Sequence, residues 1–133
     1  MSEDRSNERA DVARRVLELS ETIGEAIGYM LDKLEYAQID MDACAVMLKD
    51  IGEGLISLEN AASAVSEPIG ADPEVVGRLP MEYDELCERL DAMVDAYLEE
   101  RAGDFPALGK LLRESFSAYE GSLSACFRKS AVM

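Results

Sequence analysis

The chain has 133 residues, of which 48% are hydrophobic, so it is long enough to bury a core and is predicted to form a single domain over residues 1–133. The net charge of −15 disfavours nucleic acid and anionic membrane as partners, because both would repel the average surface. There is no histidine, which excludes Ser-His-Asp and Cys-His catalysis, imidazole metal sites and phosphorelay through histidine.

The sequence also suggests a location and a state for its thiols. No apolar run has the length of a membrane span, and the charged N-terminal sequence is unlike a signal peptide, so we expect a cytoplasmic protein. The cysteines Cys44, Cys87 and Cys126 are odd in number, match no metal motif and lie on apolar helix faces. We therefore expect three buried free thiols, no metal site and no cofactor.

A first helix is predicted over residues 7–36. Its apolar residues recur at alternating steps of four and three, and further apolar positions widen this stripe toward the C-terminal end. A wide stripe indicates contact with more than one neighbouring helix. The repeating positions are Val12, Val16, Leu19, Ile23, Ala26 and Met30, and the widening positions are Ile27, Leu31 and Leu34.

A second helix is predicted over residues 40–66, between Asp40 as the N-cap and the helix-breaking Pro68. The link at residues 37–39 is so short that the first two helices should form an antiparallel hairpin. The spacing of the apolar positions is an unbroken heptad pattern. These positions are Cys44, Leu48, Ile51, Leu55, Leu58, Ala62 and Val65.

Four glycines inside this hairpin are candidate helix-packing positions. If the chain turns near residue 38, Gly24 faces Gly52 and Gly28 lies opposite Leu48, with Gly54 close by. An interior glycine costs about 1 kcal/mol relative to alanine, so a cluster indicates close backbone approach. A notch that accepts a partner's side chain is the alternative interpretation.

Residues 67–80 are expected to be a long connecting loop, because they contain three of the four prolines. Within this loop, Asp72 followed by Pro73 is typical of a helix start. We expect a single helical turn through Val75 and Val76, and a third long helix that begins only at residue 81.

The third and fourth helices are predicted over residues 81–101 and 105–128. The turn between them is short, so they should form a second antiparallel hairpin. The predicted fold is therefore all-α, a four-helix bundle made of two antiparallel hairpins with up-down-up-down topology. The core positions of the third helix are Tyr83, Leu86, Leu90, Met93 and Tyr97, broadened by Cys87, Val94 and Leu98. Those of the fourth helix are Leu108, Leu112, Ser115, Tyr119, Ser122 and Cys126, broadened by Leu111, Phe116, Leu123 and Phe127.

Charge is concentrated on the third helix. Residues 67–104 carry twelve acidic and three basic side chains, whereas residues 105–133 carry two acidic and four basic. One interpretation is a solvated face, partly paired with Arg89 and with the fourth helix; the other is a docking surface for a basic partner. Carboxylates at this spacing are also compatible in principle with a hard cation. The stripe consists of Asp84, Glu88, Asp91 and Asp95, and continues to Glu99.

Around the first hairpin the sequence reads LEYAQIDMDACAVMLKDIGEGLISLENA. This segment, about 34–61, resembles a pattern in small bacterial all-helical proteins of unknown function, some of them encoded near flagellar or secretion genes. The resemblance implies an accessory or interaction role and supplies no catalytic residue. It is carried by Leu34, Ile39, Met47, Leu48, Asp50, Ile51, Glu53, Gly54, Leu55 and Ile56.

Three classes of function remain open. The first is a non-enzymatic protein–protein interaction module, adaptor-like or chaperone-like, that holds an amphipathic helix in a groove and has a basic or neutral protein partner. The second is a purely structural, self-assembling bundle, with a homodimer as its simplest form. The third is an enzyme or a carboxylate metal protein. The five tyrosines are expected to bury their rings and keep their hydroxyls wet.

Overall fold

The computed structural model describes residues 2–35, 41–65 and 70–131. Four long helices make up almost all of it, namely α1 (Ser2–Glu35), α2 (Met41–Ser63), α3 (Pro73–Leu98) and α4 (Phe105–Ala131). A single 3-10 turn, η1 (Ala102–Asp104), lies between α3 and α4. The described residues contain no strand, so the all-α prediction is confirmed.

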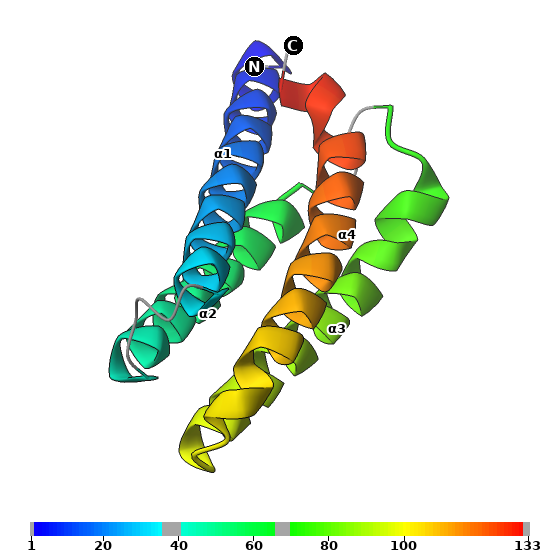
Figure 1. The fold of residues 1–133 in the computed structure, drawn as a ribbon. Coiled ribbons are helices and arrows are strands. Elements are labelled where there is room, and N and C mark those ends of the chain that lie inside the picture. The colour runs from blue at the N-terminus through cyan, green and yellow to red at the C-terminus, as the bar shows by residue number, and fades with distance from the viewer. Residues whose placement is uncertain (1, 36–40, 66–69, 132–133) are drawn as a thin grey trace.

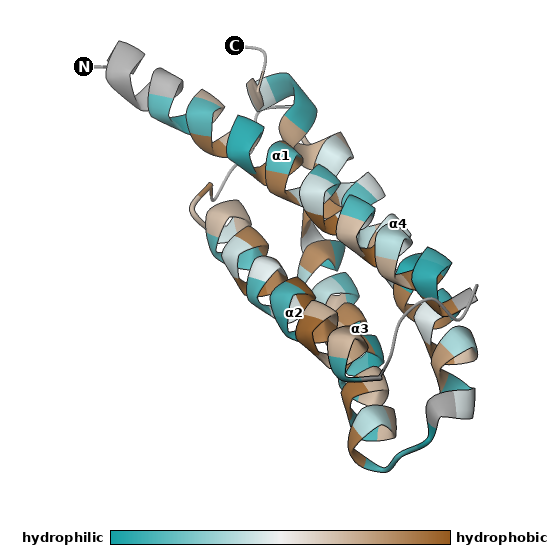
Figure 2. Ribbon diagram, turned by 60° about the vertical axis from the view of Figure 1, so that its left-hand side comes forward, coloured by the Kyte–Doolittle hydropathy of each residue, from teal (hydrophilic) through white to brown (hydrophobic). Residues whose placement is uncertain are grey.

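The helices alternate in direction, which gives the predicted up-down-up-down bundle (Figure 1). The central helix is α4, because it packs along both α1 and α3. The first hairpin partner α2 packs on α1, while its contact with α3 is the weakest of the four neighbouring pairs. Apolar positions gather where the helices face one another, and hydrophilic positions cover the outside (Figure 2).

The buried face of α1 is rotated slightly from the predicted one. Ala26 is exposed, whereas Ser20 is 2% exposed and donates a hydrogen bond to Glu120 Oε2 of α4 at 3.2 Å. The reason is that α4, rather than α2 alone, covers α1, and small residues permit that close approach. The buried line therefore runs through Ala13, Val16, Ser20, Ile23, Ile27 and Met30.

The heptad pattern of α2 is confirmed over most of its length, since Cys44, Leu48, Ile51, Leu55 and Leu58 are all buried. The helix ends at Ser63 instead of residue 66. The predicted cap at residue 40 lies outside the described residues.

The predicted loop over residues 67–80 is wrong from Pro73 onward, because α3 already begins there. The Asp72 side chain caps it by accepting a hydrogen bond from the Glu74 backbone N–H at 2.9 Å. Pro80 lies inside the helix without ending it. Partly buried side chains in the first turns, among them Val76 and Leu79, pack against the core and stabilise the extension.

Two ion pairs of one arginine stabilise the turn between α3 and α4. Arg101 pairs with Glu99 at 2.6 Å and with Asp104 at 2.8 Å, and Glu100 adopts a left-handed backbone with φ of 58°. The next helix, α4, continues three residues past its predicted end, to Ala131. Arg14 of α1 donates a hydrogen bond to the Ala131 carbonyl at 3.1 Å, which ties this last turn to α1.

The facing-glycine prediction is wrong for the pair that defined it. A Cβ at Gly24 would lie 3.2 Å from Phe116 Cε1 of α4, and a Cβ at Gly52 would lie 3.3 Å from Leu90 Cδ2 of α3. Gly54 does face α1, because its Cβ would meet Ile23 at 3.2 Å, whereas Gly28 has open space around it. The two-helix geometry failed because α1 and α2 each contact a second helix as well as one another.

The tightest glycine site of the described helices is in α4. Gly109 is buried, and a Cβ there would overlap Leu31 Cδ2 of α1. Gly121 in the same helix is exposed and has no neighbouring atom that a Cβ would meet. The two positions therefore make a matched pair for testing how closely α1 and α4 pack.

We expect the free energy of unfolding of Gly109→Ala to be about 1 kcal/mol below that of Gly121→Ala, because the half-buried Leu31 side chain must move away from the added methyl group. Gly121→Ala should raise the free energy of unfolding by about 0.5–1 kcal/mol, since it only improves helix propensity. Urea unfolding of both variants measures the difference. Equal midpoints would show that α1 is not held this close to α4.

Candidate functional site

The acidic stripe on α3 consists of Asp84, Glu88, Asp91 and Asp95, and all four are exposed. The expected pairing with Arg89 is wrong, since Arg89 pairs with Glu85 at 3.7 Å. No ion pair within the described residues joins the stripe to the basic residues of α4. The four carboxylates therefore form a stripe of unpaired negative charge, while Glu99 is neutralised by Arg101.

Beside the acidic stripe runs a second line of side chains that are apolar. Three of its members were predicted to broaden the core, but Val94 is 36% exposed, Leu98 is 70% exposed and Cys87 is only partly buried. Its members are three, four or seven residues apart, so they lie on one side of α3. We call this line the apolar strip, and its members are Val76, Pro80, Tyr83, Cys87, Val94 and Leu98.

The apolar strip borders the place where α2 and α3 separate. At one end the helices touch, because the Tyr97 hydroxyl donates a hydrogen bond to Asp42 Oδ1 at 2.8 Å and Gly52 lies against Leu90. At the other end they diverge, so that the end of α2 and the beginning of α3 lie apart (Figure 1).

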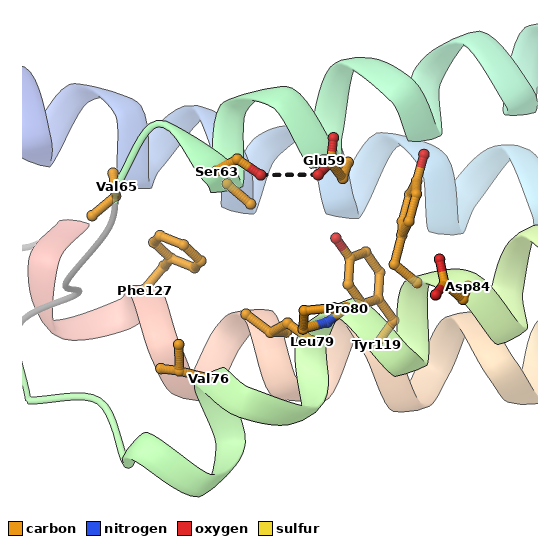
Figure 3. A pocket seen from close by; sticks show the side chains of 11 residues that line it. Glu59, Ser63, Val65, Val76, Leu79, Pro80, Asp84, Tyr119 and Phe127 are labelled. Carbon is orange, nitrogen blue, oxygen red and sulfur yellow. Dashed lines mark hydrogen bonds between the residues drawn. The ribbon is translucent and has the colours of Figure 1, made fainter.

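A pocket of about 530 Å³ occupies this divergence, within the range of known ligand sites. Three helices enclose it: α2 and α3 form its sides and α4 its floor (Figure 3). We call it the α2–α3 pocket. Its described lining residues are Glu59, Ala62, Ser63, Val65, Val76, Leu79, Pro80, Tyr83, Asp84, Tyr119 and Phe127.

The two ends of the α2–α3 pocket differ in chemistry. Val65, Val76 and Phe127 make one end apolar, and this end lies toward the end of α2 and the first turns of α3 (Figure 3). The other end, which we call the tyrosine end, contains Tyr83 and Tyr119 with the carboxylates of Glu59 and Asp84. A long side chain with an apolar stem and a charged head has the same division.

The side chains at the tyrosine end have a defined arrangement. The rings of Tyr83 and Tyr119 are tilted by 51° with centroids 5.8 Å apart, a favourable aromatic arrangement. Above them, Glu59 Oε1 accepts a hydrogen bond from the Ser63 hydroxyl at 2.9 Å (Figure 3). The carboxylate is thereby oriented from α2 toward the opening between the helices.

The electrostatics of the tyrosine end favour positive charge. Burial, with smaller contributions from the nearby Cys87, Glu59 and Asp84, raises the pKa of Tyr83 from its usual 10.0 to about 12. Burial also raises the pKa of Tyr119, with a contribution from Glu59. Both phenols stay neutral at physiological pH. The smaller contribution, from Glu59 and Asp84, is a negative field that opposes a phenolate and would attract a cation.

A second hollow of about 510 Å³ lies between α1 and α4, and its polar groups already satisfy one another. Ser20 donates to Glu120 at 3.2 Å, and Arg128 donates to the Ser124 hydroxyl at 2.9 Å. This hollow therefore presents no set of convergent, unused groups.

The described residues contain no cluster of three or more cysteine, aspartate or glutamate side chains able to hold a metal ion. All three cysteines are free, and burial raises the pKa of each. Cys44 and Cys126 are buried as expected, but Cys87 is only partly buried.

The structure assembles the site from residues that the sequence patterns treated separately. The acidic stripe was identified as a candidate site, whereas Tyr83 and Tyr119 were expected only as core positions; the ring of Tyr119 is buried as expected. Tyr29, in contrast, is 55% exposed. Glu59 and Phe127 were missed as site residues; the available signal was that Glu59 lies one helical turn from Ser63 on the border of the apolar face of α2.

The four glycines proposed from the sequence do not form a site. Gly24, Gly52 and Gly54 pack against three different helices, and none of the four lines the α2–α3 pocket. Gly24, Gly52 and Gly54 are helix-packing positions, whereas Gly28 is not.

Comparison with protein-family models, with curated proteins and with solved structures finds no match for this chain. Among the helices described, none combines the length and the apolar character needed to cross a lipid bilayer.

The raised pKa of Tyr83 predicts a loss of stability at high pH. The unfolded chain releases this proton near pH 10, but the folded protein retains it until about pH 12. Because the folded state then binds more protons, the free energy of unfolding should fall between these values. Urea unfolding at several pH values should show a shallower fall for Tyr83→Phe. Identical slopes would contradict the placement of Tyr83.

Partial exposure predicts that Cys87 is the first thiol to react. A maleimide should label Cys87 slowly in the folded protein and label Cys44 and Cys126 only after unfolding. Timed quenching with peptide mass mapping measures each site, and Cys87→Ser is the control. If Cys44 is labelled as fast as Cys87, the apolar face of α2 is not buried in the folded protein.

Proposed function

We propose that this protein is a non-enzymatic protein-binding module that holds an amphipathic helix of a basic partner along the α2–α3 side of the bundle. The observation that supports it is the continuity of three features on one side: the α2–α3 pocket, the apolar strip and the unpaired acidic stripe. The accessory role implied by the resemblance of residues 34–61 is part of this proposal.

The shape of this side suits a helical ligand. The apolar strip extends from Val76 to Leu98, about 33 Å along a helix axis. The open end provides the α2–α3 pocket, and the closed end still leaves Val94 and Leu98 accessible. A helix with apolar residues at spacings of three and four can cover such a line, because its own face has the same period.

The charges on this side of the bundle determine which charge the partner helix should carry beside its apolar face. The stripe from Asp84 to Asp95 lies directly beside the apolar strip, so a docked helix would bring its flank over unpaired carboxylates. Lysine or arginine on that flank would gain attraction, and acidic residues would be repelled. We therefore infer a partner that carries an apolar face with a basic border.

Self-assembly is the second candidate, and the exposed Leu98 and Met81 favour it, at 70% and 65% exposed. However, a two-fold pairing through the α2–α3 side would place two acidic stripes close together, where like charges repel. Sedimentation equilibrium distinguishes the two candidates. A dimer that is lost on Leu98→Asp and strengthened by salt would favour the self-assembling bundle.

The acidic stripe should control the association rate. A partner recovered from the native host should bind the unmodified protein faster at low salt than at high salt, since attraction between exposed charges is screened. Stopped-flow association should show a rate at least about tenfold lower for the stripe variant at low salt. The stripe variant combines Asp84→Asn, Glu88→Gln, Asp91→Asn and Asp95→Asn.

A control with the same change in net charge separates local attraction from overall charge. Four exposed carboxylates of α1, on another side of the bundle, serve this purpose. If the control slows association as much as the stripe variant does, the stripe is only a solubilising surface and the proposed docking side is wrong. The control combines Glu18→Gln, Glu21→Gln, Glu25→Gln and Asp32→Asn.

A further inference from the structure

We propose that the tyrosine end of the α2–α3 pocket is a recognition site for an arginine side chain, supplied by the partner helix. This inference rests on the proposed function and adds the chemical identity of one anchor residue. It is carried by two aromatic rings and two carboxylates that line one end of the same pocket.

The aromatic rings provide a surface on which a guanidinium group can stack. Tyr119 is 2% exposed and therefore fixed, while Tyr83 is partly buried and tilted against it. Both rings line the pocket, and Tyr83, the more exposed of the two, offers the accessible ring surface. Planar cations stack on tyrosine faces, and the attraction increases when water is excluded.

The carboxylates provide the charge. Glu59 comes from α2 and Asp84 from α3, so a cation between the helices would have negative charge on both sides. None of the eleven described residues that line the pocket is basic, and no ion pair within the described residues involves Glu59 or Asp84. The phenols remain neutral there and can accept or donate hydrogen bonds.

Arginine fits this end better than lysine does. Its guanidinium is planar, stacks on aromatic rings, binds a carboxylate through two parallel N–H groups and is weakly hydrated. An ammonium is more strongly hydrated and offers no flat face. Ser63 already holds Glu59 by a hydrogen bond at 2.9 Å, which orients the carboxylate before a ligand arrives.

The apolar end fixes where the next anchor of the partner lies. Phe127 and Tyr119 are eight residues apart on α4, which separates the two ends by about 12 Å. A helix lying along the pocket spans this distance in about two turns. The arginine should therefore be followed or preceded, seven or eight residues away, by a large apolar residue that contacts Phe127.

The test uses small probes on the full-length protein and needs no partner. N-acetyl-arginine amide is titrated while the amide and aromatic resonances are followed by NMR, with N-acetyl-citrulline amide as the neutral isostere and N-acetyl-lysine amide as the second cation. We expect arginine to shift resonances of Tyr83, Tyr119 and Glu59 and to show nuclear Overhauser contacts with the tyrosine rings. Citrulline should bind at least about tenfold more weakly.

Matched variants locate the charge. Glu59→Gln should weaken arginine binding about three- to tenfold, while Glu53→Gln, an exposed change on the same helix outside the pocket, should leave it unchanged. Thermal unfolding confirms that both variants are folded. Equal binding of citrulline and arginine, equal binding of lysine, or shifts confined to other surfaces would each overturn the proposal.

Failure here and failure of the proposed function give different results. If the partner binds the α2–α3 side but no arginine probe does, the docking function stands and the arginine site is wrong. Asp84 belongs to both features, so the comparison uses a stripe variant that retains it. If the probe binds the tyrosine end but this variant associates normally with the partner, the arginine site stands and the proposed docking side is wrong.

Discussion

The close packing of α4 against α1 is the constraint on which the remaining arrangement depends. Leu31 packs against Gly109, and Phe116 packs against Gly24. The hydrogen bond from Arg14 to the Ala131 carbonyl extends the α1–α4 interface to the end of α4. With α1 drawn onto α4, the two hairpins are joined on that side of the bundle. On the opposite side, α2 and α3 meet from the Tyr97–Asp42 hydrogen bond to the contact of Gly52 with Leu90, and they diverge beyond that point.

Local periodicity was sufficient to predict the helices, and it failed where the outcome depends on three-dimensional neighbours. The α2 seam from Cys44 to Leu58 follows directly from its heptad pattern. The start of α3 does not, because Pro73 and Pro80 both indicate a break when read locally, while packing of the first turns decides in favour of helix. Gly24 and Gly52 were likewise assigned to one another from a hairpin considered without α3 and α4.

The candidate site shows the same division. The acidic stripe lies on a single helix, so its spacing alone reveals it. The α2–α3 pocket combines Glu59, Tyr83 and Tyr119 from three helices, and no pattern within one helix brings them together. Val94 and Leu98 have the spacing of core residues, yet they are exposed because α2 does not reach across to cover them. Apolar spacing identifies a face that prefers burial, without specifying whether the chain itself buries it.

Pro80 weakens one turn of α3, the helix that forms one wall of the α2–α3 pocket. A proline cannot donate the main-chain hydrogen bond that a helix normally makes to the carbonyl four residues earlier, here that of Val76. The segment from Pro73 to Leu79 is thus coupled to the rest of α3 by a weakened turn. Bending at this turn tilts one side of the pocket while Leu86, Leu90 and Met93 stay in the core, so the width of the opening can adapt to its occupant without repacking the bundle.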